Sequence, residues 1–138
     1  MDFSDKIELT NTANTFMIHN YIRLTHMEED LAIVELDLHP ESRNLFGYIH
    51  GGVFFTMADS AAGGAARSRG KRYVTLSNSF EFYRNTKENG IIRAIGKVRR
   101  RGQTICVVAV DVLDENDRLL AGGTFTMFCT GDVSDALK

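Results

Sequence analysis

One acidic residue, Asp59, interrupts a stretch from Val53 to Ala66 that is otherwise mostly small and apolar. A helix of this composition is normally buried, and a buried carboxylate is costly unless it is paired, protonated or used in chemistry. Burial also raises the pKa of a carboxyl group toward the range of a useful general base. Composition alone leaves two interpretations of Asp59: a base that activates water, or a structural acid that is paired or partly exposed.

Two glycines lie immediately before this stretch. Gly51 and Gly52 fall where the chain passes from a loop into the predicted helix, and a helix N-terminus presents unpaired N–H groups and a partial positive charge. Such donors stabilise a developing oxyanion, each by about 3 to 4 kcal/mol in acyl-transfer enzymes. Glycine also allows a ligand carbonyl to approach the backbone closely. The simpler interpretation is that the two glycines only make a turn.

Asn44 and His50 precede the predicted helix in a loop that would bring both side chains near its N-terminus. An amide can orient water, and an imidazole can orient the loop or donate to a carbonyl. No second histidine or acid lies at catalytic spacing from His50, so the sequence does not support a general base there. The chain has no P-loop, G-x-G-x-x-G, G-x-S-x-G or H-E-x-x-H motif, which argues against nucleotide-binding proteins, serine hydrolases and zinc proteases.

The charge balance favours a small ligand over a nucleic acid. The net charge is −2, and residues of both signs are spread along the chain, whereas nucleic-acid binders need a basic surface. Four arginines near predicted turns are candidates for binding the phosphate groups of a ligand: Arg84, Arg99, Arg100 and Arg101. Solvated strand ends are the alternative explanation for them.

The cysteines and the N-terminus bear on cofactors and location. Cys106 and Cys129 lie in apolar stretches without a C-x-x-C pattern, so we predict neither a metal site nor a disulfide, and no cofactor. The N-terminal residues are polar and acidic, unlike a signal peptide, and the stretch from Val53 to Ala66 is too short to span a bilayer. We therefore expect no membrane association and a reducing, cytoplasmic setting.

The elements that must position these residues can be read from the hydrophobic pattern. Residues Leu31 to Leu38 alternate between apolar and charged, which is typical of a half-buried strand. The segment from Tyr21 to Met27 is expected to pair with it, and the alanine-rich segment from Gly52 to about Arg67 is expected to be helical. Four further strands are predicted at Tyr73–Phe82, Ile91–Arg99, Thr104–Leu113 and Arg118–Cys129. This order predicts an α+β fold in which a sheet curls around a central helix.

The length and composition predict one domain over residues 1–138. The chain is 43% hydrophobic and has a single proline, and no linker-like segment interrupts it. The first twenty or so residues carry no diagnostic pattern. A sheet of this kind has exposed edge strands, and pairing of two copies is a common way to cover them.

The spacing Asn44-x2-Gly47-x2-His50-Gly51-Gly52-x6-Asp59 resembles the signature of hotdog-fold acyl-CoA thioesterases, in the branch that includes phenylacetate-pathway enzymes. The resemblance extends over the expected strand order from residue 21 to residue 129. It implies an antiparallel sheet wrapped around a long central helix. It also implies a homodimer, commonly paired into a dimer of dimers, with active sites between subunits.

The resemblance assigns roles to several residues of this chain. It implies that the amide of Gly51 polarises the thioester carbonyl, and that Asp59 of the other subunit activates water or attacks directly. Asn44 is expected to help place the water. Thr75 fits a hydroxyl that often assists on the following strand, and Ser77 is the alternative because the length of the preceding loop leaves the alignment open.

The resemblance also implies substrate contacts. His50 and Gly52 belong to the same signature, as catalytic and substrate-binding candidates respectively. An acyl chain would occupy a pocket lined by helix and sheet residues, for which the candidates are Phe54, Phe55, Met57 and Phe82. Arg84 and the basic stretch from residue 99 to residue 101 then become candidates for contacting the phosphates of coenzyme A.

The leading hypothesis is therefore hydrolysis of an aryl- or medium-chain acyl-CoA to the free acid and coenzyme A. One alternative is a non-catalytic protein that binds or senses acyl-CoA on the same fold. A dehydratase would need a histidine and an acid placed together for proton abstraction and return, and the sequence does not provide that pair. The sequence leaves the acyl group open, and also whether Asp59 is the base or the nucleophile.

Overall fold

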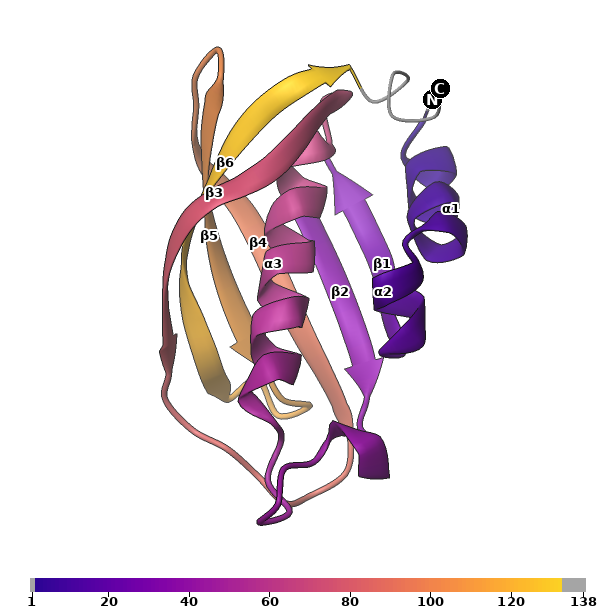
Figure 1. The fold of residues 1–138 in the computed structure, drawn as a ribbon, viewed down its shortest axis with the longest axis vertical. Coiled ribbons are helices and arrows are strands. Elements are labelled where there is room, and N and C mark those ends of the chain that lie inside the picture. Colours follow the sequence, from indigo (N-terminus) through magenta and orange to yellow (C-terminus); the bar gives the residue numbers. More distant parts are fainter. Residues whose placement is uncertain (1, 133–138) are drawn as a thin grey trace.

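The computed structural model describes residues 2–132, and its long helix lies in the concave side of a curved sheet (Figure 1). This helix, α3, spans Gly51–Arg67. The sheet has six strands in the order β1-β2-β4-β5-β6-β3, and every neighbouring pair is antiparallel. The strands are β1 Ile22–Glu28, β2 Leu31–Asp37, β3 Lys71–Phe82, β4 Ile91–Arg101, β5 Ile105–Leu113 and β6 Leu119–Asp132. The predicted α+β fold is confirmed.

Small residues allow α3 to lie very close to the sheet. A Cβ atom at Gly96 on β4 would be 2.6 Å from the carbonyl oxygen of Ala61, and one at Gly64 would be 2.9 Å from the Cβ of Ala32 on β2. Both distances are shorter than real Cβ contacts, so larger residues would push the helix away from the sheet. One side of α3 is thereby fixed against β2 and β4, and the opposite side stays partly open to solvent.

Strand β3 contains a β-bulge that decides which of its side chains face α3. Thr75 is paired with Met127 and Ser77 with Thr126, so the register shifts by one residue between them. Met127 lies in the buried core, and Thr126 is only partly buried, on the other face of the sheet. A bulge changes the face onto which the following side chains point. Thr75 therefore faces α3, and Ser77 faces outward.

Two short helices precede the sheet: α1 (Phe3–Ala13) and α2 (Thr15–His19). The Asn11 side chain of α1 makes two hydrogen bonds of 2.8 Å with the backbone of Leu24 on β1, donating to its C=O and accepting from its N–H. The Lys6 ammonium donates to the carbonyl oxygen of Ser68 at 2.8 Å. Neither helix was predicted from the sequence, because α1 has no buried residue and so lacks an apolar stripe, and α2 has only five residues.

The remaining differences from the sequence-based expectation are at element ends. Strands β4 and β6 continue to Arg101 and Asp132, two and three residues beyond the predicted ends. A short 3-10 helix, η1 (Pro40–Ser42), lies in the loop before α3. Among the described residues, no helix is both long and apolar enough to cross a membrane.

Candidate active site

The N-terminus of α3 is capped by the side chain of His50. Its Nδ1 accepts a hydrogen bond of 2.9 Å from the N–H of Gly52, and its carbonyl oxygen accepts one of 2.9 Å from the N–H of Val53. The N–H of Gly51, the first residue of α3, has no acceptor within the helix, and it has none elsewhere in residues 2–132. His50 is thus a capping residue, and Gly51 keeps the N–H that an oxyanion would need.

The loop before His50 is held by two asparagine side chains. The Asn44 Oδ1 accepts from the N–H groups of Phe46 and Tyr48, at 2.9 and 3.1 Å. The Asn85 amide donates to the C=O of Ile49 and accepts from its N–H, at 2.9 and 3.0 Å. Sequence reasoning missed Asn85, which lies in an irregular loop after β3 and carries no pattern. Because the oxygen of Asn44 is used within the loop, its Nδ2 group is left to face a ligand.

Five of the residues predicted from the sequence line one groove beside the start of α3. The groove has a volume of about 390 Å³, and its lining includes Asn44, Gly51, Phe54, Phe82 and Arg84. The Phe82 ring lies 3.6 Å from the position that a Cβ of Gly51 would occupy. We call Asn44, Gly51, Phe82 and Arg84 the donor half of the site, because the unpaired N–H of Gly51 is its distinguishing feature.

The Asp59 carboxylate is held by Thr75. The Thr75 Oγ1 donates a hydrogen bond of 2.5 Å to Asp59 Oδ1 and lies 3.6 Å from the sulfur of Met127. Of the two hydroxyls considered from the sequence, Thr75 is therefore the one beside Asp59, and Ser77 lies on the other face of the sheet. Asp59 is only partly buried, so the expected full desolvation is not present in one chain. We call Asp59 and Thr75 the acid half.

Within one chain, the donor half and the acid half are too far apart to act on the same carbonyl group. Gly51 and Asp59 are eight residues apart on α3, which corresponds to about 12 Å along the helix axis. A hydrogen-bond donor and a base that act on one thioester must both lie within about 3 Å of the reacting atoms. Within one chain, the N–H of Gly51 and the Asp59 carboxylate are therefore too far apart to act on the same carbonyl group.

Aromatic side chains run between α3 and the β3 end of the sheet. The ring centroids of Phe55 and Phe80 are 5.8 Å apart, and those of Phe80 and Phe82 are 5.2 Å apart. Phe55 also packs against Phe125, and Phe54 against Phe82. Phe54 and Phe82 line the groove beside the start of α3, and an acyl pocket that includes Phe55 stays a prediction. Met57, like Phe54, is fully buried in the core.

Arg101 serves a structural purpose at the other end of α3. Its guanidinium donates to the carbonyl oxygens of Ala65 and Ala66, to the Tyr73 hydroxyl and to the Asp30 carboxylate, at 2.9 to 3.2 Å. The side chain is only 15% exposed. These partners occupy its donors within the chain, and the contact between Arg101 and coenzyme A phosphates stays a prediction.

Asp30 is the acceptor that organises this end of the molecule. Arg69 donates two hydrogen bonds to its carboxylate, at 3.0 and 2.5 Å. The bonds from Arg69, and those from Arg101, hold the pKa of Asp30 below its ordinary value, although partial burial acts in the opposite direction. Arg99 and Arg100 are exposed near the same end, at the opposite end of α3 from the donor half.

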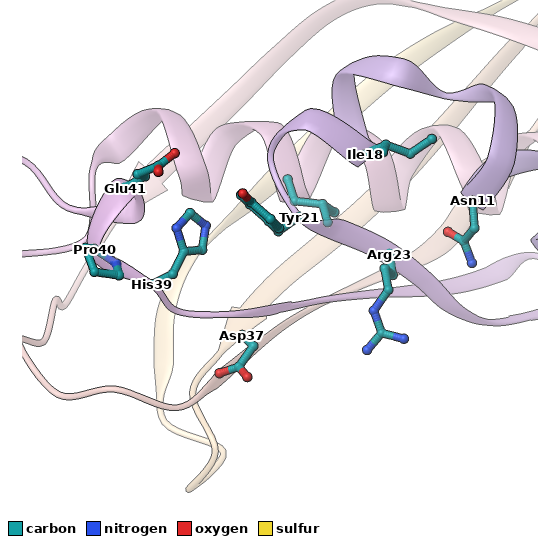
Figure 2. Close-up of a pocket in the computed structure, with 9 residues that line it drawn as sticks. Asn11, Ile18, Tyr21, Arg23, Asp37, His39, Pro40 and Glu41 are labelled. Atoms are coloured by element: carbon teal, nitrogen blue, oxygen red, sulfur yellow. The ribbon is translucent and has the colours of Figure 1, made fainter.

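A larger cavity of about 730 Å³ lies elsewhere, between α2 and the start of β1 (Figure 2). Its lining includes Tyr21 and His39, whose rings pack edge to face at 4.5 Å. None of the sequence-predicted site residues lines this cavity. The chemistry that acyl transfer requires lies at the smaller groove and at Asp59, so volume alone does not identify the site.

Comparison with known proteins agrees with this geometry. Residues 46–121 match the model of the thioesterase superfamily. A 1,4-dihydroxy-2-naphthoyl-CoA hydrolase of Listeria monocytogenes is 29% identical over 103 residues, which cover 72% of this chain and 82% of the relative.

Two solved structures resemble the whole fold. A Streptococcus mutans protein bound to acetyl-CoA is 32% identical, with a TM-score of 0.76 and coverage of 80% of this chain and 90% of that one. The Escherichia coli PaaI protein from the phenylacetic acid degradation operon is 20% identical, with a TM-score of 0.88 and coverage of 94% of both chains. The family model alone spans more than half of this chain. The chain therefore belongs to the thioesterase superfamily, and its antiparallel sheet wrapped around α3 is the hotdog fold of that family's thioester hydrolases.

Proposed function

We propose that this protein hydrolyses an aryl- or medium-chain acyl-CoA to the free acid and coenzyme A. The observation that carries the proposal is the Asp59 carboxylate, which Thr75 holds on the open side of α3. The unpaired N–H of Gly51 supplies the second requirement of acyl transfer, an oxyanion donor. The names of the relatives support the substrate class, since one is a hydrolase of an aromatic acyl-CoA and another binds acetyl-CoA.

We infer that the working site forms between two copies of the chain. Strand β3 is an edge strand of twelve residues, and its Val74 and Leu76 side chains are 51% and 61% exposed. A long apolar edge of this kind is suited to pairing with the same strand of a second copy. Such a pairing would set the donor half of one copy against the acid half of the other. Further pairing of two dimers remains a prediction.

In the proposed reaction, the N–H of Gly51 binds the thioester carbonyl oxygen, and Asp59 of the partner copy removes a proton from a water molecule. The oxygen of that water attacks the carbonyl carbon, and negative charge develops on the oxygen bound at Gly51. Collapse of the intermediate breaks the carbon–sulfur bond, and the leaving thiolate takes up a proton. Thr75 keeps the carboxylate oriented, and the Nδ2 group of Asn44 is free to position water or the thioester.

The proposal is tested by measuring thiol release from a panel of aryl- and medium-chain acyl-CoA thioesters. An Asp59→Asn variant should lose about 100- to 10,000-fold in rate, the usual contribution of a general base. Its thermal stability and oligomeric state should stay unchanged. Asp37→Asn is the matched control, because Asp37 is exposed at the end of β2, and it should keep the full rate.

Two results would contradict the proposal. An undiminished rate in Asp59→Asn would remove Asp59 from the mechanism. Tight binding of acyl-CoA without thiol release from any thioester would favour the non-catalytic alternative.

A single turnover in oxygen-18 water would separate the two possible roles of Asp59, since a base places the label in the acid product at once. Direct attack by the carboxylate lets an unlabelled enzyme oxygen appear in the first product.

A further inference from the structure

Arg67, the last residue of α3, folds its side chain back along the helix. Its Nη1 atom lies 2.6 Å from the position that a Cβ of Gly63 would occupy. The guanidinium therefore rests directly on the backbone of Gly63, in space that any larger residue would fill. Asp59, Gly63 and Arg67 follow one another at intervals of four residues, so they share one ridge of the helix. Measured along the helix axis, the charge of Arg67 thus lies about one turn, or about 5.4 Å, from Asp59.

This guanidinium has no anionic partner in the described part of the chain. Within residues 2–132, the Arg67 side chain makes no hydrogen bond or ion pair, although it is partly buried beside Lys6, Leu9 and Met27. Burial lowers the pKa of Arg67, and the negative charge of Asp59 acts in the opposite direction. A partly desolvated cation is costly unless an anion meets it.

The two neighbouring arginines make the difference clear. Arg69 and Arg101 both donate to the carboxylate of Asp30, and Arg101 also binds the last carbonyl groups of α3. Both side chains are paired with the Asp30 carboxylate and so help to hold the fold together. Arg67 alone among the three lies on the ridge of Asp59, and it is the one without an acceptor in residues 2–132.

The substrate is the available source of an anion at this level of α3. In an acyl-CoA, the pantetheine arm next to the thioester is uncharged, and the phosphates lie at its far end. A negative charge within a few ångström of the reacting carbonyl must therefore belong to the acyl group. The hydroxyl groups of Thr56 and Ser60, both partly exposed on the same side of α3, would add polar contacts for such a group.

We propose that Arg67, seated on Gly63, selects acyl groups that carry a second carboxylate a few carbon atoms from the thioester. The proposal rests on the proposed thioesterase function and specifies its substrate class. Arg67 acts on specificity, through a charge-assisted hydrogen bond with the distal carboxylate of the acyl group. It takes no part in the chemical step.

The test compares acyl-CoA thioesters of equal chain length with and without the distal carboxylate. Glutaryl-CoA is paired with pentanoyl-CoA, and succinyl-CoA with butyryl-CoA, and kcat/KM is measured for each. The ratio within a pair cancels any loss of folded enzyme. Arg67→Gln should lower the ratio by about 10-fold or more, as expected for a lost hydrogen bond to a charged group. Arg69→Gln, two residues further along, should leave it unchanged.

A second variant moves the charge without removing it. Gly63→Ala places a methyl group close to the present position of Nη1, so the flexible end of Arg67 must shift. The helix itself should not be weakened, because alanine has a higher helix propensity than glycine. The ratio should fall in Gly63→Ala as it does in Arg67→Gln, and Arg67→Lys should retain part of it. A merely structural role for Arg67 would lower both members of a pair equally, and that result would overturn the proposal.

Failure of the thioesterase function would be recognised separately, as absence of thiol release from every thioester in the wild type. The same pairs would then be compared by calorimetric binding to the Asp59→Asn variant, with and without Arg67→Gln. A preference for glutaryl-CoA that disappears with Arg67→Gln supports the proposal even without turnover. Equal affinities for the two members of a pair in both backgrounds overturn it.

Discussion

The two ends of α3 differ in how their polar groups are used. At the C-terminal end, Arg101 and Ser68 bind the carbonyl groups of the last turn, and Asp30 binds both Arg69 and Arg101. At the N-terminal end, the N–H of Gly51 stays unpaired beside an open groove, and the Phe82 side chain that lines it is 57% exposed. Apart from the Arg67 guanidinium, the polar side chains at the C-terminal end are paired within the chain, whereas the N–H of Gly51 at the other end stays available.

This difference separates residues that hold the fold from residues that can act on a ligand. A buried polar group whose bonds are all satisfied within the chain contributes to stability and has nothing left for a substrate. An oriented donor or carboxylate on an accessible surface contributes little to stability and remains available. The distinction explains why Arg101 is a poor candidate for binding coenzyme A and Gly51 a good one for binding a carbonyl.

The largest effect is expected from removing the hydrogen bonds of Arg101 at the C-terminal end of α3. Arg101→Met removes hydrogen bonds to two carbonyl groups, a hydroxyl and a carboxylate, and should lower the free energy of unfolding by about 3 kcal/mol. Chemical denaturation measures this loss. Arg100→Met, at an exposed neighbour, should stay within about 0.5 kcal/mol of the wild type. Equal stability of the two variants would show that the network at this end is not what holds α3.

A smaller effect is expected at the acid half, and on activity rather than stability. Thr75→Val removes the hydrogen bond to Asp59 and should lower kcat/KM by about 10-fold, with the folded state retained. Ser77→Ala is the matched control, because that hydroxyl lies on the outer face of the sheet. If both variants kept full activity, Thr75 would not be needed to orient the carboxylate.

The smallest expected effect is on the free energy of unfolding at low pH. Because the pKa of Asp30 is lowered in the folded state, its ionised form adds stability above its unfolded pKa of about 3.9. That contribution is lost as the pH falls through the folded pKa. The difference in unfolding free energy between wild type and Asp30→Asn should therefore be constant near pH 6 and shrink below about pH 4. The lowered pKa of Asp114 is common to both proteins and cancels. A difference that grows in acid would contradict this.

The sequence was informative where a local pattern carries the structure. The alternation in residues Leu31–Asp37 and the alanine-rich run of α3 are both local signals, and both elements were predicted within a residue or two. The spacing from Asn44 to Asp59 is also local, because it lies within one loop and one helix. The helix begins at Gly51, one residue before the predicted start, and two residues of the spacing, Asn44 and Gly51, line the groove.

The sequence was uninformative where contacts between distant segments determine the structure. The bonds of Arg101 join it to residues 28 to 71 positions away, so it looked like a free basic residue in a run of three. The choice between Thr75 and Ser77 depended on a bulge defined by pairing with β6. Helix α1 is tied to β1 by polar contacts such as that of Asn11 with Leu24, and α2 has five residues with only Met17 buried, so neither helix shows a hydrophobic period.

The contact of Asn11 with Leu24 also limits how many molecules can join. The amide occupies both backbone groups of Leu24 on β1, so that border of the sheet is interrupted for an incoming strand. Strand β3 lies at the other border, and no strand within residues 2–132 pairs with its outer edge. A molecule that can gain a neighbour at only one border forms a finite pair, because each addition consumes the single open border of both partners. We therefore expect strand addition to stop at a pair, because α1 covers the border at β1.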